Sequence, residues 1–401
     1  MIRTIFLSVL LTYFLWNLSA QNEPGDKAGK GSAGGIRTGA EQTEKYFPLL
    51  EGKRIAVCSN QTGIIGAVHL VDTLLHAGFN VVKIFSPEHG FRGHAADGEW
   101  IDDKKDFDTG LEIVSLYGSK KKPEAEDLEN LDIIVFDIQD VGVRFYTFIS
   151  TLSYLMETCA ENHLPLIVLD RPNPHSDYVD GPVLEKEFAS FVGLHPVPVV
   201  YGMTIGEYAR MVNGEHWLKD SLNCDLTVIP LRNYDHRTRF DLPVPPSPNL
   251  PNQASVQLYP SLCFFEGTIV SVGRGTDMPF QVIGHPDYVL GSYFFIPEDK
   301  PGKAMNPPYE GKRCYGHFLS GFDTIMERRI YLTWLIEMYQ FFKIIKKPDF
   351  FNSFFDKLAG SDQLRQQIME GKSETEIRQS WEEDISAFLV LRKKYLLYPD
   401  F

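Results

Sequence analysis

Six short apolar runs, interleaved with helical patterns, constrain the fold of this chain more than any other feature. The runs cover residues 54–60, 81–85, 111–117, 133–137, 166–170 and 225–229, and helical spacing covers 68–77 and 145–163. Strands that alternate with helices indicate right-handed crossovers and a mainly parallel sheet. Strands in such a sheet are apolar throughout because helices cover both faces. The sequence therefore predicts an α/β fold with a Rossmann-like sheet domain.

The N-terminal 44 residues are expected to lie outside this domain. Residues 1–20 combine Arg3 with an apolar core and end in small residues, a pattern typical of a secretory signal cleaved near Ala20. Residues 21–44 are mostly Gly, Ser, Ala and charged residues and are predicted to form a flexible linker. We therefore expect an exported, periplasmic protein. An uncleaved membrane anchor is the alternative.

A proline-rich stretch marks a boundary in the folded part. Residues 243–251 read Pro-Val-Pro-Pro-Ser-Pro-Asn-Leu-Pro, which cannot extend a helix or a central strand. We place the Rossmann-like catalytic domain at 45–245 and a smaller α+β auxiliary domain at 246–401.

Charge and motif content narrow the possible partners. The net charge of -14 argues against nucleic acid, which needs clustered basic side chains. No G-x-G-x-x-G follows the first strand and no phosphate-binding loop with Lys is present, so no nucleotide cofactor is expected. The five cysteines contain no CxxC pair, which leaves a zinc or redox motif unsupported and favours buried thiols. We predict neither cofactor nor metal.

Polar residues follow four of the predicted strands. Because ligands bind beyond the carboxyl ends of parallel strands, these clusters should line one edge of the sheet. The clusters cover 59–63, 86–90, 137–144 and 170–174, and their candidates for substrate contact include Asn60, Gln61, Asp137, Gln139, Asp170 and Asn173.

Glu88 is the leading candidate for catalysis. It follows a strand and a proline, and a carboxyl in a partly apolar cleft suits a general acid. The alternative is a helix cap or an ion pair with Arg92. His89 is a candidate proton shuttle or sugar ligand. Asp140 is the candidate second catalytic carboxyl, although a purely architectural role at the strand end is an equal alternative for it and for Asp137.

Arginine and aromatic side chains add candidates for substrate binding. Arg92, Arg144, Arg171 and Arg274 could hold an anion, because the guanidinium group binds carboxylates through two hydrogen bonds. Tyr146 could stack on a sugar or donate a proton. Glu266 could reach the cleft from the second domain, with an ion pair to Arg274 as the alternative.

Several strings, in order along the chain, resemble one family. They are Ser86-Pro-Glu-His-Gly-Phe-Arg-Gly93, Phe136-Asp-Ile-Gln-Asp-Val-Gly-Val-Arg-Phe-Tyr-Thr147, Leu169-Asp-Arg-Pro-Asn-Pro174, Tyr201-Gly-Met-Thr-Ile-Gly-Glu207, Pro246-Ser-Pro-Asn-Leu-Pro251, Phe265-Glu-Gly-Thr268 and Gly273-Arg-Gly-Thr276. These strings and the closing Tyr395-Leu-Leu-Tyr398 resemble the NamZ-like exo-β-N-acetylmuramidases, formerly a domain of unknown function. The resemblance covers about 46–401. Two departures are Tyr201, where the family commonly has His, and His285, where Ala is usual.

This resemblance implies an exo-acting glycoside hydrolase. Such enzymes release β-1,4-linked N-acetylmuramic acid from the non-reducing end of peptidoglycan fragments, and their active site lies between a Rossmann-like and an auxiliary domain. Glu88 matches the family's candidate acid. Muropeptides or disaccharide fragments would be the partners. Retaining, inverting and substrate-assisted mechanisms stay open. The alternatives are a non-catalytic cell-wall sugar-binding protein and a metal-dependent hydrolase.

Overall fold

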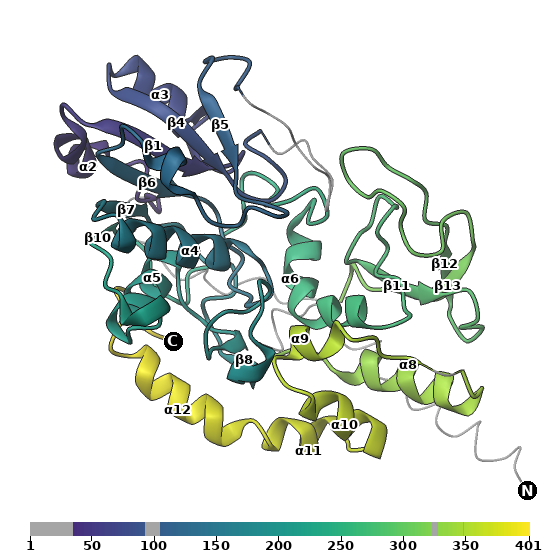
Figure 1. Ribbon diagram of the computed structural model, residues 1–401. Helices are drawn as coiled ribbons and strands as arrows, with labels where there is room; N and C mark the ends of the chain where they lie inside the picture. Colours follow the sequence, from purple (N-terminus) through teal and green to yellow (C-terminus); the bar gives the residue numbers. More distant parts are fainter. Residues whose placement is uncertain (1–34, 93–104, 323–327, 348) are drawn as a thin grey trace, which may run out of the picture. The chain divides into compact units, whose positions relative to one another are not determined.

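Six parallel strands form the central sheet of the protein (Figure 1). The computed structural model describes residues 35–92, 105–322, 328–347 and 349–401. Along the sheet the order is β10-β7-β6-β1-β4-β5, so the strand order reverses at β1 as in a Rossmann fold. The strands are β1 (Arg54–Ser59), β4 (Asn80–Ser86), β5 (Glu112–Ser115), β6 (Ile133–Asp137), β7 (Leu166–Leu169) and β10 (Leu226–Ile229). The predicted α/β fold is confirmed, and all six predicted strands are present.

Apolar side chains on both faces of the sheet explain why the strand sequences are continuously apolar. On β1, Ile55 and Val57 pack with α2 (Thr43–Leu50) and α3 (Leu70–His76), while Ala56 and Cys58 face the opposite way. The opposite face is covered by α4 (Phe148–Glu161) and α5 (Ile205–Gly214). Successive strand residues therefore enter two different hydrophobic layers.

The folded part of the chain begins before residue 44, where the predicted linker was expected to end. Residues 36–42 already belong to the fold, because Arg37 bridges to Arg232 and Ala40 is completely buried. The buried side chain of Gln42 donates a hydrogen bond to Pro230 O at 2.6 Å, just before α2 begins. The packing of this segment is not evident from the sequence, because its residues are mostly polar or small. The predicted signal at 1–20 lies outside the described residues.

The second half of the chain adds a small antiparallel sheet and several helices. The three-stranded sheet has the order β11 (Val282–His285), β13 (Cys314–Phe318), β12 (Tyr293–Phe295). The helices are α6 (Gln253–Leu262), α8 (Thr333–Ile344), α9 (Phe355–Ala359), α10 (Gln363–Glu370), α11 (Glu374–Gln379) and α12 (Glu382–Arg392). This mixture of antiparallel strands and helices agrees with the expected α+β part. The remaining short pairs are β2 (Ile64–Ile65) with β3 (Val68–His69) and β8 (Asp180–Val183) with β9 (Pro198–Val200).

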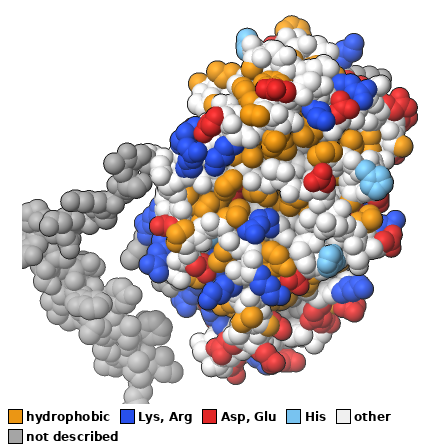
Figure 2. All heavy atoms as spheres, turned by 90° about the vertical axis from the view of Figure 1, so that its left-hand side faces the viewer, with side chains coloured by type: hydrophobic (Ala, Val, Ile, Leu, Met, Phe, Trp, Pro, Cys, Tyr) orange, Lys and Arg blue, Asp and Glu red, His pale blue; other side chains and the backbone are white. Residues whose placement is uncertain are grey.

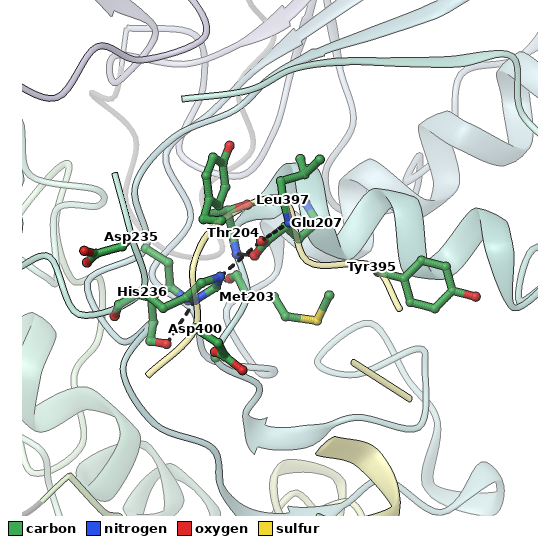
Figure 3. Close-up of polar contacts among 12 residues, drawn as sticks. Met203, Thr204, Glu207, Asp235, His236, Tyr395, Leu397 and Asp400 are labelled. Atoms are coloured by element: carbon green, nitrogen blue, oxygen red, sulfur yellow. Dashed lines mark hydrogen bonds and ion pairs between the residues drawn. The ribbon is translucent and has the colours of Figure 1, made fainter. Parts of the chain in front are cut away.

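The C-terminal segment returns to the parallel sheet domain. Figure 3 shows Glu207 accepting hydrogen bonds from Leu397 N at 2.7 Å and from His236 Nε2 at 3.1 Å. Tyr398 OH donates to the buried carboxyl of Asp170 at the end of β7. The end of the second half is therefore part of the framework of the first, and the two halves are joined more closely than the sequence boundary suggests.

On the face drawn in Figure 2, acidic and basic side chains are interspersed with apolar ones. All five cysteines are buried and free, in line with the expectation that most of them are buried thiols. In the part of the chain that the structure describes, no helix has both the length and the apolar character needed to span a bilayer.

Candidate active site

A cavity of about 390 Å³ is lined by both halves of the chain. Its size falls within the range of small-molecule sites, about 300–1,000 Å³. The first half contributes Glu88 after β4 and the four consecutive residues 145–148 that lead into α4, and the second half contributes Glu266, Arg274 and aromatic rings. Five predicted site residues line this cavity: Glu88, His89, Tyr146, Glu266 and Arg274.

A tight turn after β4 presents Glu88 to the cavity. Gly90 N donates to Pro87 O at 3.1 Å, which places Glu88 at the first corner of the turn. His89, at the second corner, has φ of +71°, a conformation that non-glycine residues seldom adopt. Backbone strain of this kind is concentrated at functional sites. The buried His89 ring and the half-buried Glu88 carboxyl are thus positioned by a constrained backbone.

The start of α4 holds the Glu88 side chain from the other side. Thr147 Oγ1 donates to Glu88 Oε2 at 2.9 Å. Tyr146 directly precedes Thr147 and is 7% exposed. Its ring makes an edge contact with the ring of Tyr259, with ring centres 5.9 Å apart. Phe145 also contacts Tyr259, with ring centres 5.3 Å apart. An apolar aromatic wall therefore lies beside the carboxyl that Thr147 helps to hold in place.

The second half contributes an ion pair to the cavity. Arg274 Nε lies 2.5 Å from Glu266 Oε1, and each side chain is 20% exposed. Arg274 lies between two glycines with left-handed backbone, Gly273 (φ +78°) and Gly275 (φ +79°), and its guanidinium carbon lies 5.3 Å from the centre of the Phe280 ring. Both readings of Glu266 therefore hold: it pairs with Arg274 and it also lines the cavity. Among the described lining residues, Arg274 is the only Lys or Arg.

The strand-end carboxylates are buried and lie outside the cavity lining. Asp137 and Arg171, 0% and 4% exposed, form a two-bond ion pair with distances of 2.6 and 2.9 Å. Asp140, predicted to be catalytic, is 4% exposed and lies outside the lining. Its Oδ2 accepts from Gly142 N at 2.7 Å and from Tyr201 OH, and burial raises its pKa to about 6. These contacts support the architectural alternative for Asp140.

Asp170, like Asp140, is a buried carboxyl that accepts hydrogen bonds from neighbouring segments. Its carboxyl accepts from Gly206 N and Thr204 Oγ1, each at 2.8 Å, in addition to Tyr398 OH. Burial raises the pKa of Asp170 to about 7. The structure therefore places it among the contacts that join strand β7 to helix α5 and to the C-terminal segment.

Two of the arginines that were predicted to bind an anion make their hydrogen bonds with other parts of the protein. Arg144 is 0% exposed and donates to the carbonyls of Pro182, Val197, Leu358 and Ala359 at 2.7–3.0 Å. Arg92 forms a two-bond pair with Asp106 at 3.0 and 2.9 Å. Neither lines the cavity, so the geometry does not support their binding a substrate carboxylate.

The predicted amide side chains also hold loops together. Asn60 Oδ1 accepts from Thr62 N at 3.0 Å, and Gln139 Nε2 donates to Pro172 O at 2.6 Å. Asn173 Nδ2 donates to Met203 O at 2.7 Å. Gln61 Nε2 donates to Pro245 O and Pro246 O, each at 3.1 Å, and lines a separate hollow. The four residues therefore lie outside the cavity lining.

Comparison with known proteins identifies the family. Two family models match the chain: the N-terminal model of the exo-β-N-acetylmuramidase NamZ at residues 55–254 and the C-terminal model at residues 257–398. The chain belongs to the NamZ family. It is therefore a glycoside hydrolase. The two models meet about ten residues after the predicted boundary at 245/246.

Individual NamZ-family relatives agree with this assignment. The peptidoglycan β-N-acetylmuramidase NamZ of Bacillus subtilis is 38% identical over 376 residues, which cover 88% of this chain and 89% of that protein. Two crystal structures of DUF1343 family proteins from Bacteroides fragilis share the fold. One is 49% identical with a TM-score of 0.85, covering 92% of this chain and all of that one. The other is 29% identical with a TM-score of 0.73, covering 90% and 99% of the two chains.

The departures from the NamZ pattern lie in the framework. Tyr201 is completely buried and bonds to Asp140. His285, 1% exposed on β11, has its pKa lowered to about 4 by burial and accepts a hydrogen bond from Asp287 N at 2.9 Å. Neither side chain lines the cavity.

Sequence reasoning missed most of the lining of this NamZ-family cavity. Aromatic rings dominate the omissions, and they look like ordinary core residues in a sequence. Asn249 and Thr147 stood in strings that carried the family resemblance, which was the available signal. The missed residues are Tyr117, Phe145, Thr147, Phe148, Phe191, Val192, Ser247, Asn249, Leu250, Tyr259, Phe280 and Phe354.

Proposed function

We propose that this protein releases β-1,4-linked N-acetylmuramic acid from the non-reducing end of peptidoglycan fragments, with Glu88 as the general acid. The observation that carries the proposal is the position of Glu88 at the corner of a constrained turn, in a sugar-sized cavity of a NamZ-family protein. A relative 38% identical to this chain bears the name peptidoglycan β-N-acetylmuramidase.

The chemistry follows from the lining residues. Glu88 gives its proton to the glycosidic oxygen as the bond from that oxygen to the anomeric carbon breaks. Water supplies the new hydroxyl at that carbon, and the remaining proton of the water restores the protonated Glu88 carboxyl. Thr147 Oγ1, 2.9 Å from Glu88 Oε2, helps to hold the carboxyl in position in the cavity wall. Removal of water by the aromatic walls strengthens these polar contacts.

Arg274 and Glu266 act on the sugar from the second half of the chain. N-acetylmuramic acid carries a lactyl carboxylate. Arg274, which is the only Lys or Arg among the described lining residues, can bind this carboxylate. Glu266 replaces Asp140 as the candidate second carboxyl, because it lines the cavity and Asp140 does not. Its Oε1 is bonded to Arg274 Nε, which fixes the position of both side chains.

We also propose that the protein is exported to the periplasm. This proposal rests on the sequence of residues 1–20 alone, and it agrees with the location of the proposed substrate in the cell envelope. N-terminal sequencing of the mature protein from the envelope fraction tests it, with a new N-terminus near Gln21 as the expected result.

The hydrolysis experiment compares two substrates with different leaving groups. Wild-type protein should cleave both the 4-nitrophenyl β-glycoside of N-acetylmuramic acid and its disaccharide with N-acetylglucosamine. Glu88→Gln should lower kcat by about 10²–10⁴ on the disaccharide. The loss should be smaller for 4-nitrophenol, because this good leaving group needs less help from an acid. Equal losses on both substrates would contradict the role of Glu88, and no release by the wild type would contradict the function.

A further inference from the structure

A second hollow of about 390 Å³ lies beside the cavity. It is built from the loop after β1, the proline-rich connection and a loop of the second half that includes Gly302. Its described lining residues are Gln61, Val244, Pro245, Ser247, Pro248, Pro301, Gly302 and Lys303. Gln61, which the sequence predicts to contact substrate, is one of these residues.

The hollow and the cavity share a wall. Ser247 lines both spaces. Two residues further on, Asn249 lines the cavity, while its Nδ2 donates to the carbonyl of Lys303 in the hollow at 2.9 Å. The two spaces therefore adjoin at Ser247.

The wall of the hollow is preformed. Proline fixes its own φ, and Gln61 Nε2 holds the carbonyls of Pro245 and Pro246 at 3.1 Å. Gly302 adopts φ of +73°, which a larger residue would rarely tolerate, and Lys303 N donates to Lys300 O at 3.0 Å. A ligand that binds here pays little to order the loops, which favours affinity.

The composition of the hollow fits an uncharged sugar. Three proline rings and Val244 give apolar surfaces for the C–H faces of a pyranose, and Ser247, Gln61 and Lys303 offer polar groups for its hydroxyl and amide rim. The described lining contains no carboxylate and no arginine. The cavity, by contrast, contains the Glu266–Arg274 pair, which suits a sugar that carries a carboxylate.

We propose that the hollow binds the sugar on the leaving side of the cleaved bond, an uncharged N-acetylated hexose of the kind that alternates with N-acetylmuramic acid in peptidoglycan. This proposal rests on the proposed function. It places the muramic acid in the cavity and the rest of the fragment across Ser247.

Steady-state kinetics with the two substrates test the proposal. Val244→Trp fills the hollow and should raise KM for the disaccharide at least about tenfold. Lys303→Ala removes an exposed side chain and should raise this KM about two- to tenfold, the loss of one or two polar contacts. Both variants should leave kcat and KM for the 4-nitrophenyl glycoside within about twofold, because 4-nitrophenol lacks the second sugar. Lys312→Ala, an exposed lysine of the same half that lies outside the hollow, is the matched control.

The outcomes separate the two proposals. Unchanged disaccharide kinetics in both variants would overturn the subsite while leaving the proposed function intact. Equal losses on both substrates would also overturn it, because they would indicate a change in the cavity rather than a lost contact with the second sugar. A wild-type protein that cleaves neither substrate would overturn the proposed function, and the subsite with it.

Discussion

The cavity and the strand ends both contain carboxyl groups, but the environments of these groups differ. Glu88 and Glu266 are partly exposed and line an open space. Asp137, Asp140 and Asp170 are at most 4% exposed and accept hydrogen bonds from residues of other loops. A buried carboxyl is tolerated when such donors surround it, and it then joins the loops that supply them. Position at a strand end is therefore insufficient evidence for chemistry, and exposure to a cavity is the better guide.

A matched pair of amide substitutions gives the largest expected contrast. Glu88→Gln should lower kcat on the disaccharide by about 10²–10⁴ and change the free energy of unfolding by less than about 1 kcal/mol. Asp140→Asn should do the reverse. It disturbs a buried acceptor of Tyr201 OH and Gly142 N, so we expect a stability loss of about 1–3 kcal/mol and a kcat within about tenfold of wild type. Turnover and urea denaturation of both variants test this, and a folded but inactive Asp140→Asn protein would refute the division.

The buried pair of Asp137 and Arg171 should affect stability strongly. Arg171→Met leaves the Asp137 carboxylate buried without its partner, which costs about 3–5 kcal/mol. The double variant Asp137→Leu with Arg171→Met should recover much of this loss, because it removes the isolated charge as well. Urea denaturation of the two proteins provides the measurement. A single variant as stable as wild type, with a raised KM, would return Arg171 to substrate binding.

Asp170 should make the stability of the strand-end region depend on pH. The pKa of Asp170 is raised to about 7, against about 3.9 for a free aspartate. Between these values the folded protein binds more protons than the unfolded chain, so this group's contribution to stability is full below about pH 4 and is lost as the pH rises to about 7. The expected loss is on the order of 2–4 kcal/mol.

Comparison of wild type with Asp170→Asn isolates this contribution from that of the other carboxyls. The difference in unfolding free energy between the two proteins should change over the interval from about pH 4 to about pH 7 and stay constant above it. Curves that run parallel from pH 4 to pH 8 would show that Asp170 is ionised throughout, as its hydrogen-bond donors would favour.

The sequence predicts the sheet well because each strand carries its own signal. Continuous apolar runs such as 133–137 enter layers on both faces, and this local pattern survives any change in the loops. The cavity has no comparable signal. Glu88 could be found from its position after β4, but Arg144 and Asp140 have the same kind of position and turn inward. Tyr259 and Phe280 reach the cavity from far along the chain, a tertiary contact that no local pattern records.

The smallest expected effect concerns substrate choice at the Glu266–Arg274 pair. Arg274→Lys keeps the positive charge but loses the planar group that binds a carboxylate through two bonds. We expect KM for the 4-nitrophenyl glycoside of N-acetylmuramic acid to rise about tenfold, equivalent to about 1.4 kcal/mol. The corresponding N-acetylglucosamine glycoside lacks the lactyl carboxylate, so its kinetics should change little. Preference between the two substrates would then fall by the same factor. An equal rise in KM for both glycosides would show that Arg274 serves only to hold Glu266 in place. The cavity would then contain a framework ion pair like that of Asp137 and Arg171.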